Sequence, residues 1–186
     1  MNKIHLETER LYIRKIQAAD EKGFFELDSD PEVHRYLGNK PVKTIEEARA
    51  AIRHIFQQYE DNGIGRWAVI EKATGDFIGW TGLKFITTEI NKQIHYYDLG
   101  YRLIRKYWGK GYATETAEAT LIHGFETMNL SEIYAMVDVQ NKASKNVLEK
   151  AGLQCMETFN YQGDEHYWLK ITKEHWLKTK KNKFKI

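Results

Sequence analysis

The segment from Trp108 to Glu115, Trp-Gly-Lys-Gly-Tyr-Ala-Thr-Glu, carries the clearest chemistry in this 186-residue chain. Its small residues Gly109, Gly111 and Ala113 let the backbone turn tightly and approach a ligand without collisions of Cβ atoms. The segment follows a predicted strand and opens a predicted helix, whose first N–H groups lack partners within the helix and carry partial positive charge. Four cations lie at the same end: Arg102, Arg105, Lys106 and Lys110. We therefore predict a site for a pyrophosphate group.

Three other interpretations of this glycine-rich segment compete with a pyrophosphate site. A Walker loop needs Ser or Thr directly after its lysine, whereas Lys110 is followed by Gly111. A dinucleotide fingerprint would place a third glycine at Thr114 and would need a mainly parallel sheet. The last alternative is a glycine-rich turn that binds nothing. The coincidence of glycines, cations and a strand-to-helix junction favours the pyrophosphate site.

The elements before this segment must form an antiparallel sheet with covering helices. Alternating apolar and polar residues predict a strand over residues 6–16. Thr44 and Glu47 form a capping box that opens a helix, and Gly63 ends that helix. The other predicted elements are short helices at 18–27 and 31–37, a hairpin of strands at 66–72 and 77–86, and a strand at 95–104.

The elements after the segment change the topology. They are a helix at 112–128, a strand at 132–139, a helix at 142–150 ended by Gly152, strands at 153–159 and 166–171, and a short helix near Trp176. A strand, a helix and a second strand in succession imply one right-handed parallel crossover. The sequence thus predicts an α+β fold with a mixed, mostly antiparallel twisted sheet that contains one parallel βαβ crossover.

Composition limits the class of protein. The chain is 42% apolar, it contains no apolar run near the roughly 20 residues of a membrane helix, and its start does not resemble a secretory signal. We expect one cytoplasmic domain over residues 1–177 and a basic tail over 178–186. The histidines have no metal-ligand spacing, so we expect no metal. Cys155 is the single cysteine, and we expect it to be buried in a strand.

The tail allows two interpretations. Its lysines, Lys178, Lys180, Lys181, Lys183 and Lys185, have no acid among them. They could form an arm for RNA or for an acidic partner, which predicts binding that weakens steeply with salt. They could equally be a solvated, frayed end. We favour the frayed end, and so expect no nucleic-acid partner.

Five stretches in the right order resemble one family. They are Leu6–Arg14, Ile78–Leu83, Leu99–Tyr101 leading to Trp108, the Trp108–Glu115 segment, and Asn141–Ser144 followed by Leu148–Gly152. Together they resemble the GNAT acetyltransferase superfamily and, more narrowly, its branch of ribosomal-protein-alanine N-acetyltransferases. Each stretch alone is weak evidence for a family, but their order along nearly the whole chain is specific evidence for this one. The resemblance implies helices on both faces of the sheet.

The resemblance also implies an N-acetyltransferase that uses acetyl-CoA as co-substrate, without metal or covalent intermediate. In that family the pantetheine arm lies along the fourth strand, where this strand splays from the fifth. Here it would meet backbone groups near Tyr101, Arg102 and Leu103, and an exposed amide near Leu99 or Gly100 could polarise the thioester carbonyl. The pyrophosphate would lie on the segment that follows Trp108, namely Gly109, Lys110, Gly111, Tyr112, Ala113 and Thr114.

Two positions depart from the superfamily pattern. Many members have Gln or Arg where Trp108 stands, although tryptophan is usual in the branch. The tyrosine that commonly protonates the leaving thiolate falls at Leu148, which has no proton to donate. Ser144 lies one helical turn earlier on the same face, and we expect it to be the catalytic acid. The alternative is a serine that satisfies local backbone groups. Asn141 could cap that helix, contact CoA, or do both.

No general base is obvious, and this bears on the acceptor. Asp98, Asp164 and Glu165 are the candidates. At pH 7 an α-amine is roughly 15% neutral and a lysine about 0.04%, a difference of about 3.5 kcal/mol that a weak base would not overcome. We therefore expect an amine acceptor of the α-amine type, such as a protein N-terminus, no membrane partner, and a monomer or homodimer. The alternative function is a catalytically inert, regulatory acyl-CoA-binding module, which would bind CoA without releasing thiol.

Overall fold

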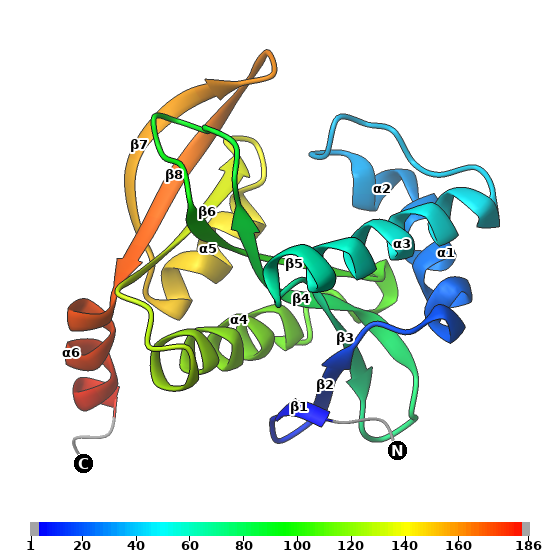
Figure 1. Cartoon of the computed structure of the whole chain (residues 1–186), viewed down its shortest axis with the longest axis horizontal. Helices are drawn as coiled ribbons and strands as arrows, with labels where there is room; N and C mark the ends of the chain where they lie inside the picture. The colour runs from blue at the N-terminus through cyan, green and yellow to red at the C-terminus, as the bar shows by residue number, and fades with distance from the viewer. Residues whose placement is uncertain (1–3, 184–186) are drawn as a thin grey trace.

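The computed structural model describes residues 4–183 and contains one eight-stranded sheet with the order β1-β2-β3-β4-β5-β6-β8-β7 (Figure 1). Its strands are β1 Ile4–Glu7, β2 Leu11–Lys15, β3 Trp67–Glu71, β4 Phe77–Ile86, β5 Tyr96–Leu103, β6 Glu132–Asp138, β7 Gln154–Tyr161 and β8 Asp164–Thr172. Neighbouring strands are antiparallel except for β5 and β6, which are parallel. The predicted α+β class and the single parallel crossover are confirmed.

The first predicted strand is in fact two strands. A turn at residues 8–10 separates β1 from β2, so the prediction of one strand over residues 6–16 is wrong. Thr8 explains the break, because its N–H donates to the carbonyl of Leu11 and its hydroxyl oxygen accepts from the N–H of Leu11, each at 3.0 Å. Side-chain oxygens of this kind offer the backbone an alternative to the sheet ladder.

Helices α1 and α3 cover one face of the sheet. Helix α1 runs over Glu21–Ser29 after a short 3₁₀ turn at Ala18–Asp20, α2 covers only Pro31–His34, and α3 runs over Ile45–Asn62. The C-terminal cap of α3 and one half of its capping box are confirmed: Gly63 ends the helix in the left-handed conformation, and the Thr44 hydroxyl accepts from the N–H of Glu47. The Glu47 carboxylate accepts from the N–H of Lys43 rather than from that of Thr44. Buried side chains of α1 and α3 pack on the strands: Phe24, Ala48, Ile52 and Ile55 against Ile16 and Ala68.

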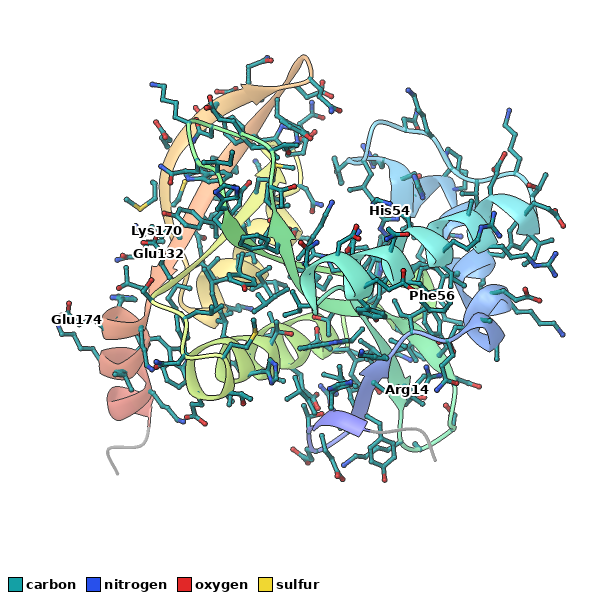
Figure 2. All side chains as sticks on the ribbon, in the orientation of Figure 1. Arg14, His54, Phe56, Glu132, Lys170 and Glu174 are labelled. Carbon is teal, nitrogen blue, oxygen red and sulfur yellow. The ribbon has the colours of Figure 1, made fainter. Side chains whose placement is uncertain are left out.

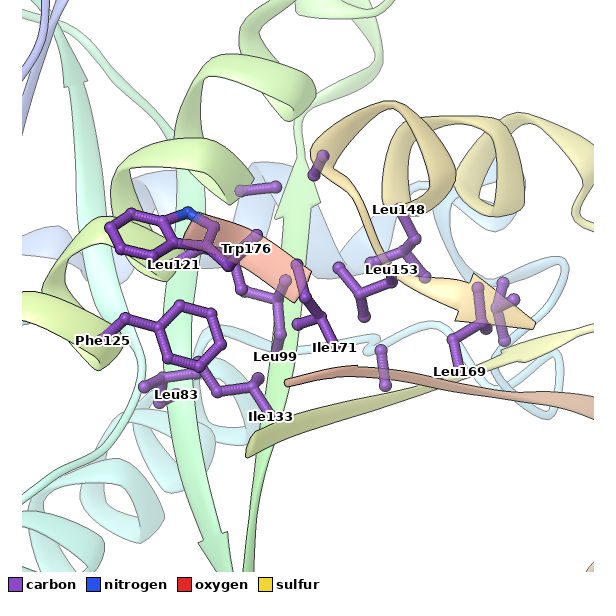
Figure 3. Packing of buried hydrophobic residues seen from close by; sticks show 14 of the residues in the cluster. Leu83, Leu99, Leu121, Phe125, Ile133, Leu148, Leu153, Leu169, Ile171 and Trp176 are labelled. Carbon is purple, nitrogen blue, oxygen red and sulfur yellow. The ribbon is translucent and has the colours of Figure 1, made fainter. Parts of the chain in front are cut away.

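The other face is covered by α4 Tyr112–Ile122, α5 Lys142–Ala151 and α6 Lys173–Lys183. A 3₁₀ turn at Arg105–Tyr107 precedes α4, and a π-helical turn at His123–Thr127 follows it, so the predicted helix over 112–128 is regular only to residue 122. One apolar cluster joins these helices to the strands (Figure 3), with Leu83, Leu99, Leu121, Phe125, Ile133, Leu148, Leu153, Leu169, Ile171 and Trp176 at its centre. Helices therefore lie on both faces, as expected.

Gly79 sets how closely β4 approaches β5. Its φ is +149°, and a Cβ there would lie 2.1 Å from the carbonyl oxygen of Arg102. Only glycine allows this approach, because any side chain would collide with the backbone of β5. The residue therefore helps to fix the position of β5, along which the predicted coenzyme site lies.

The C-terminal strands end in a helix that carries part of the lysine-rich tail. On the sheet, the Lys170 ammonium of β8 pairs with the Glu132 carboxylate of β6 at 2.6 Å (Figure 2). Helix α6 continues past residue 177. The Lys178 ammonium bonds to Glu174 of the same helix, and the Lys180 ammonium bonds to Glu126 in the turn after α4, each at 2.6 Å. These two lysines are thus paired with acids rather than presented as a free cationic arm.

Two further sequence expectations concern residues near this end. Lys185 lies outside the described residues, and the side chains of Lys181 and Lys183 are not described either. Cys155 is exposed on β7, which is the edge strand of the sheet, so the expectation that it is buried is wrong. Over residues 4–183, no helix is long and apolar enough to cross a membrane.

Candidate active site

Strands β5 and β6 diverge at the centre of the sheet. Within the described chain, their parallel ladder consists of the pair Asp98 and Tyr134 alone. Beyond Asp98, β5 continues beside β4 as far as Leu103, while β6 pairs with β8. The edge of β5 over residues 99–103 therefore faces a gap in the ladder rather than a paired strand. The backbone of Tyr101, Arg102 and Leu103 therefore lies where the family resemblance implies that two strands diverge.

The segment after β5 turns directly into α4. The indole N–H of Trp108 donates to the carbonyl of Leu103 at 2.7 Å and closes this turn. Gly109 and Gly111 have φ values of +73° and +83°, which favour glycine, and Gly111 is the N-cap of α4. In the part of the chain that the structure describes, no side chain caps this helix end. Among the described residues, no atom outside the adjacent residues lies within 4 Å of a Cβ built on Gly109, so this side of the loop is open.

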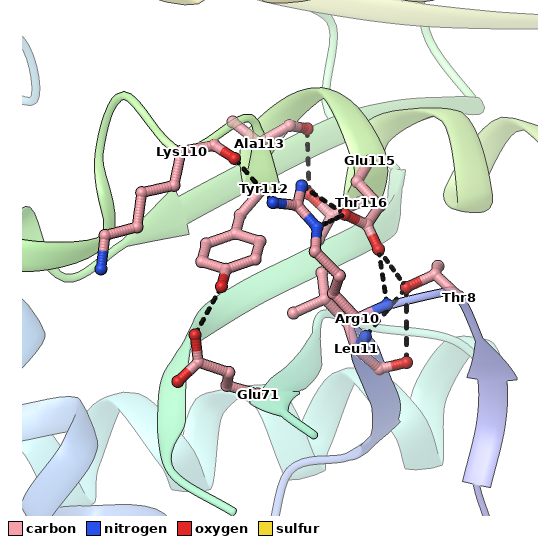
Figure 4. A network of polar contacts seen from close by, with 9 residues as sticks. All are labelled: Thr8, Arg10, Leu11, Glu71, Lys110, Tyr112, Ala113, Glu115 and Thr116. Carbon is pink, nitrogen blue, oxygen red and sulfur yellow. Dashed lines mark hydrogen bonds and ion pairs between the residues drawn. The ribbon is translucent and has the colours of Figure 1, made fainter. Parts of the chain in front are cut away.

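A network of polar contacts fixes this loop to the start of the sheet (Figure 4). The Arg10 guanidinium donates from Nη1 to the carbonyl of Lys110 at 2.9 Å and from Nε to Glu115 at 2.7 Å, and it lies 4.3 Å from the centre of the Tyr112 ring. The Glu115 carboxylate also accepts from the Thr8 hydroxyl at 2.5 Å. We call these four side chains and the Lys110 carbonyl the Arg10 clamp.

The Arg10 clamp holds Glu115 in its charged form. Partial burial raises the pKa of Glu115, but hydrogen bonds from Thr8 and Arg10 outweigh it and leave that pKa below its ordinary value. Sequence reasoning did not find this contact, because Arg10 and Glu115 are 105 residues apart. The available signal was that both residues lie in stretches that resemble the same family.

Three of the four cations predicted to charge the loop are already paired. Their partners lie in or next to α1: Arg102 with Asp28 at 2.6 Å, Arg105 with Asp30 at 3.0 Å, and Lys106 with Glu26 at 2.9 Å. These pairs attach α1 and α2 to the end of β5, so acids beside the loop balance three of the four positive charges. The Lys110 ammonium lies over the ring of Tyr107 at 5.1 Å.

A shallow, open surface pocket of about 520 Å³ adjoins the N-terminus of α4. Its lining comes from the turn after β1 and from α4: Thr8, Glu9, Arg10, Gly111, Thr114, Glu115 and Glu118. Gly111 and Thr114 belong to both the cavity wall and the predicted pyrophosphate loop. A ligand on the loop amides therefore has open space beside it.

The residues predicted around the leaving group are brought together across the gap. The Tyr101 hydroxyl lies 2.9 Å from the Ser144 hydroxyl and 3.0 Å from the Ser144 carbonyl oxygen. Asn141 caps α5, since its side-chain oxygen accepts from the N–H of Ser144 at 3.1 Å. Burial raises the pKa of Tyr101 to about 12, although the bond to Ser144 acts in the opposite direction. Leu148 lies one turn further on and is buried in the core.

The candidate bases have different surroundings. Asp98 lies at the point where the strands diverge. Burial raises its pKa above the ordinary value, although Arg66 opposes the shift by bonding to its carboxylate. Asp164 and Glu165 are exposed at the start of β8. Of the three, the structure places Asp98 beside the gap.

On the face covered by α1 and α3, two arginines flank an indole near Asp98. The guanidinium carbons of Arg66 and Arg102 lie 5.4 and 5.0 Å from the ring of Trp80. Gly100 makes room for this arrangement, because a Cβ there would lie 2.6 Å from Nη2 of Arg66. Within residues 4–183, no group of three or more His, Cys, Asp or Glu residues could hold a metal ion.

Comparison with known families and sequences gives a consistent result. The model of the acetyltransferase (GNAT) domain matches residues 10–154. The chain is 33% identical over 149 residues to the uncharacterized N-acetyltransferase p20 of Bacillus licheniformis, which covers 80% of this chain and 82% of that protein. It is 30% identical over 190 residues to the FsC-acetyl coenzyme A-N(2)-transacetylase of Aspergillus fumigatus, covering 95% of this chain and 79% of that protein.

Solved structures share the fold. An acetyltransferase of the GNAT family from Bacillus anthracis has a TM-score of 0.76 at 28% identity, covering 91% of this chain and 98% of that one. Two neighbours show the fold alone, each with a TM-score of 0.73. One is the ribosomal-protein-S5-alanine acetyltransferase of Vibrio fischeri, at 19% identity, covering 94% of this chain and 99% of that one. The other is the spermidine N-acetyltransferase of Vibrio cholerae in complex with CoA and spermine, at 20% identity, covering 91% of this chain and 99% of that one.

Proposed function

The chain belongs to the GNAT acetyltransferase family and is an acetyl-CoA-dependent N-acetyltransferase, and from this premise we propose that its acceptor is an α-amine, such as a protein N-terminus. The acetyl group is transferred directly, within a ternary complex. The observation that carries the coenzyme site is the uncapped N-terminus of α4, which the Arg10 clamp holds at the end of β5.

The coenzyme site uses backbone groups for most of its contacts. The amides of residues 109–114 would take the pyrophosphate, because they combine free N–H groups with the positive end of a helix. The edge of β5 at Tyr101, Arg102 and Leu103 would take the pantetheine arm, since no strand pairs with it there. Trp108 fixes the junction between the two parts through its bond to Leu103. Asn141 would hold the first turn of α5 beside the thioester.

The reaction needs no group outside these residues and the two substrates. The lone pair of the amine nitrogen attacks the thioester carbonyl carbon, and a C–N bond forms while negative charge moves to the oxygen. An amide near Leu99 or Gly100 donates to this oxyanion. The C–S bond then breaks, the thiolate leaves with its electron pair, and the Ser144 hydroxyl gives it a proton. The nitrogen loses one proton, which restores the serine hydroxyl, so the products are an amide and a thiol.

Two arguments favour an α-amine over a polyamine or a lysine side chain. A polyamine needs a carboxylate to bind its second ammonium. The two aspartates on the face of the sheet under α1 and α3 are already paired: Asp28 is bonded to Arg102, and Asp98 is bonded to Arg66. The α-amine also needs little help to lose its proton, because about one in seven such groups is neutral at pH 7. At the same pH, a lysine side chain needs about 3.5 kcal/mol more than an α-amine to reach its neutral form.

A panel of acceptors tests this proposal. The chain is incubated at pH 7 with acetyl-CoA and with a lysine-containing peptide whose N-terminus is free, with the same peptide blocked at its N-terminus, or with spermidine. Thiol release gives the rate, and mass spectrometry gives the site of acetylation. We expect the free peptide to react at its N-terminus at least tenfold faster than the blocked peptide and spermidine. Equal rates for the blocked peptide or spermidine would refute the α-amine acceptor.

The same experiment distinguishes an enzyme from an inert binding module. A module that only binds acyl-CoA would be thermally stabilised by CoA, increasingly as the CoA concentration rises above the Kd, yet would release no thiol with any acceptor. We expect both stabilisation and thiol release.

A further inference from the structure

The hydroxyl pair of Tyr101 and Ser144 has a consequence for the leaving group. We propose that Tyr101 is a positioning residue, whose phenol O–H aims the Ser144 hydroxyl at the departing sulfur. This inference rests on the proposed function, because it takes Ser144 as the proton donor. The phenol acts only through Ser144.

The geometry gives the pair two hydrogen-bond arrangements. Tyr101 has one hydroxyl proton, and two acceptors on Ser144 lie within reach: the hydroxyl oxygen at 2.9 Å and the carbonyl oxygen at 3.0 Å. When the phenol donates to the carbonyl, the serine proton is free to be donated back to the phenol oxygen. When the phenol donates to the serine oxygen, the serine proton has to point elsewhere. The second arrangement leaves that proton available for an incoming sulfur.

Both side chains are held in place from independent elements. Tyr101 belongs to β5, on the far side of the gap from α5, and its ring packs against the apolar core. Ser144 is in the first turn of α5, where the Asn141 cap holds its N–H. The contact therefore spans the diverging strands at the level where the pantetheine arm is proposed to lie. A fixed phenol restricts the rotation of the serine hydroxyl, whose C–O bond would otherwise turn freely.

Burial keeps the Tyr101 phenol protonated, so that it can donate a hydrogen bond. Because the pKa of Tyr101 is raised to about 12, the group stays protonated through the range in which an amine acceptor reacts. In the step itself, the C–S bond breaks, and the O–H bond of Ser144 breaks as its proton moves to the sulfur. Negative charge builds on the serine oxygen, which the phenol stabilises by its hydrogen bond. The amine nitrogen then returns a proton to the serine oxygen, and no bond to Tyr101 is made or broken.

The test removes the phenol oxygen alone. Tyr101→Phe keeps the buried ring, and we expect kcat to fall about tenfold or more, while KM for acetyl-CoA stays within about twofold. Tyr59→Phe is the matched control. Tyr59 is likewise partly buried with a pKa raised to about 12, and its hydroxyl bonds to backbone groups of Ile16 and Arg66 on α3's side of the sheet. It should lose comparable thermal stability but keep its kcat.

A double-mutant cycle separates positioning from a general structural effect. If Tyr101 acts through Ser144, Tyr101→Phe should cost less than about twofold in kcat when Ser144→Ala is already present. Equal losses in both backgrounds, or a rise in KM in place of a fall in kcat, would overturn the inference while acetyl transfer itself still stands. If the unaltered chain released no thiol with any amine, the proposed function would fail, and the inference would fall with it.

Discussion

Helices α4 and α5 follow the diverging strands β5 and β6, and their N-termini are built in opposite ways. Helix α4 starts at Gly111, which supplies no side chain to cap it. Helix α5 starts at Asn141, whose side chain bonds to the N–H of Ser144, and the Ser144 hydroxyl in turn contacts Tyr101. One helix end is left open, whereas the other is closed by its own side chains.

The difference shows how one structural element can serve two tasks. An open end offers amides to an external anion, and this suits a diphosphate that brings its own negative charge. A closed end offers a single oriented hydroxyl, which suits a proton donor. The open end then needs support from elsewhere, and the Arg10 clamp supplies it through contacts to Lys110 and Glu115. Changes at the two ends should therefore separate into effects on turnover and effects on coenzyme affinity.

The largest effect is expected at the closed end. Ser144→Ala removes the proposed proton donor but leaves the backbone N–H that Asn141 caps. We expect kcat to fall about 100-fold, as is usual for loss of an acid catalyst, with the Kd of CoA unchanged within about twofold. Steady-state kinetics and calorimetric titration measure the two quantities. Ser131→Ala, at an exposed position before β6, is the control, and an unchanged kcat in Ser144→Ala would rule out Ser144 as the acid.

A charge placed at the open end should change affinity instead. Gly109→Asp and Gly109→Asn have nearly the same shape, both side chains tolerate the left-handed backbone better than most, and a Cβ at Gly109 has open space. They differ in charge. We expect the Kd of CoA to be at least about tenfold higher for the aspartate variant than for the asparagine variant, with similar thermal stability of the free proteins. Equal Kd values would show that the anion lies elsewhere.

Loss of the Arg10 clamp should weaken coenzyme binding less, because the loop amides remain. Arg10→Gln keeps part of the side-chain volume but loses the charge and the bidentate reach. We expect the Kd of CoA to rise about three- to tenfold and the melting temperature to fall by a few degrees. Arg35→Gln is the control, since Arg35 is exposed and pairs loosely with Glu32 at 3.8 Å. A Kd unchanged by Arg10→Gln would show that the clamp does not organise the loop.

The smallest effect concerns pH. The pKa of Glu115 is lower in the folded chain than its ordinary value of 4.5, so the carboxylate stabilises the fold above that pH. This contribution is lost as the pH falls through the lowered, folded-state pKa. We expect the melting temperature of the unaltered chain to drop more steeply below about pH 4.5 than that of Glu115→Gln. Parallel curves for the two proteins over this range would contradict the assignment.

Local signals in the sequence predict the open end of α4 well. Glycines at 109 and 111 adopt positive φ, and the strand-to-helix junction lies where the pattern placed it. The caps of α3 at Thr44 and Gly63 were also predictable, because they depend on residues a few positions apart, and the single crossover follows from the order of the predicted strands and helices. The break at Thr8 and the exposure of Cys155 were not, since they depend on a turn and on which strand lies at the edge of the sheet.

Long-range contacts were beyond the sequence. Arg10 and Glu115 are 105 residues apart, and Tyr101 and Ser144 are 43 apart, so no periodicity links them. The sequence proposed Tyr101 for its backbone and Ser144 for its hydroxyl, but not that the two side chains meet. It also placed the cations Arg102, Arg105 and Lys106 near the loop, but it did not reveal the acidic partners near α1 that balance their charge. Charge partners of this kind become visible when the strands and helices are assembled.

The most direct measurement is a crystal structure of the chain in complex with CoA. The account predicts that oxygens of the diphosphate lie within hydrogen-bond distance of the amides between Gly109 and Thr114, with Arg10 still bonded to the Lys110 carbonyl. A diphosphate bound at any other place, with these amides facing solvent, would contradict it.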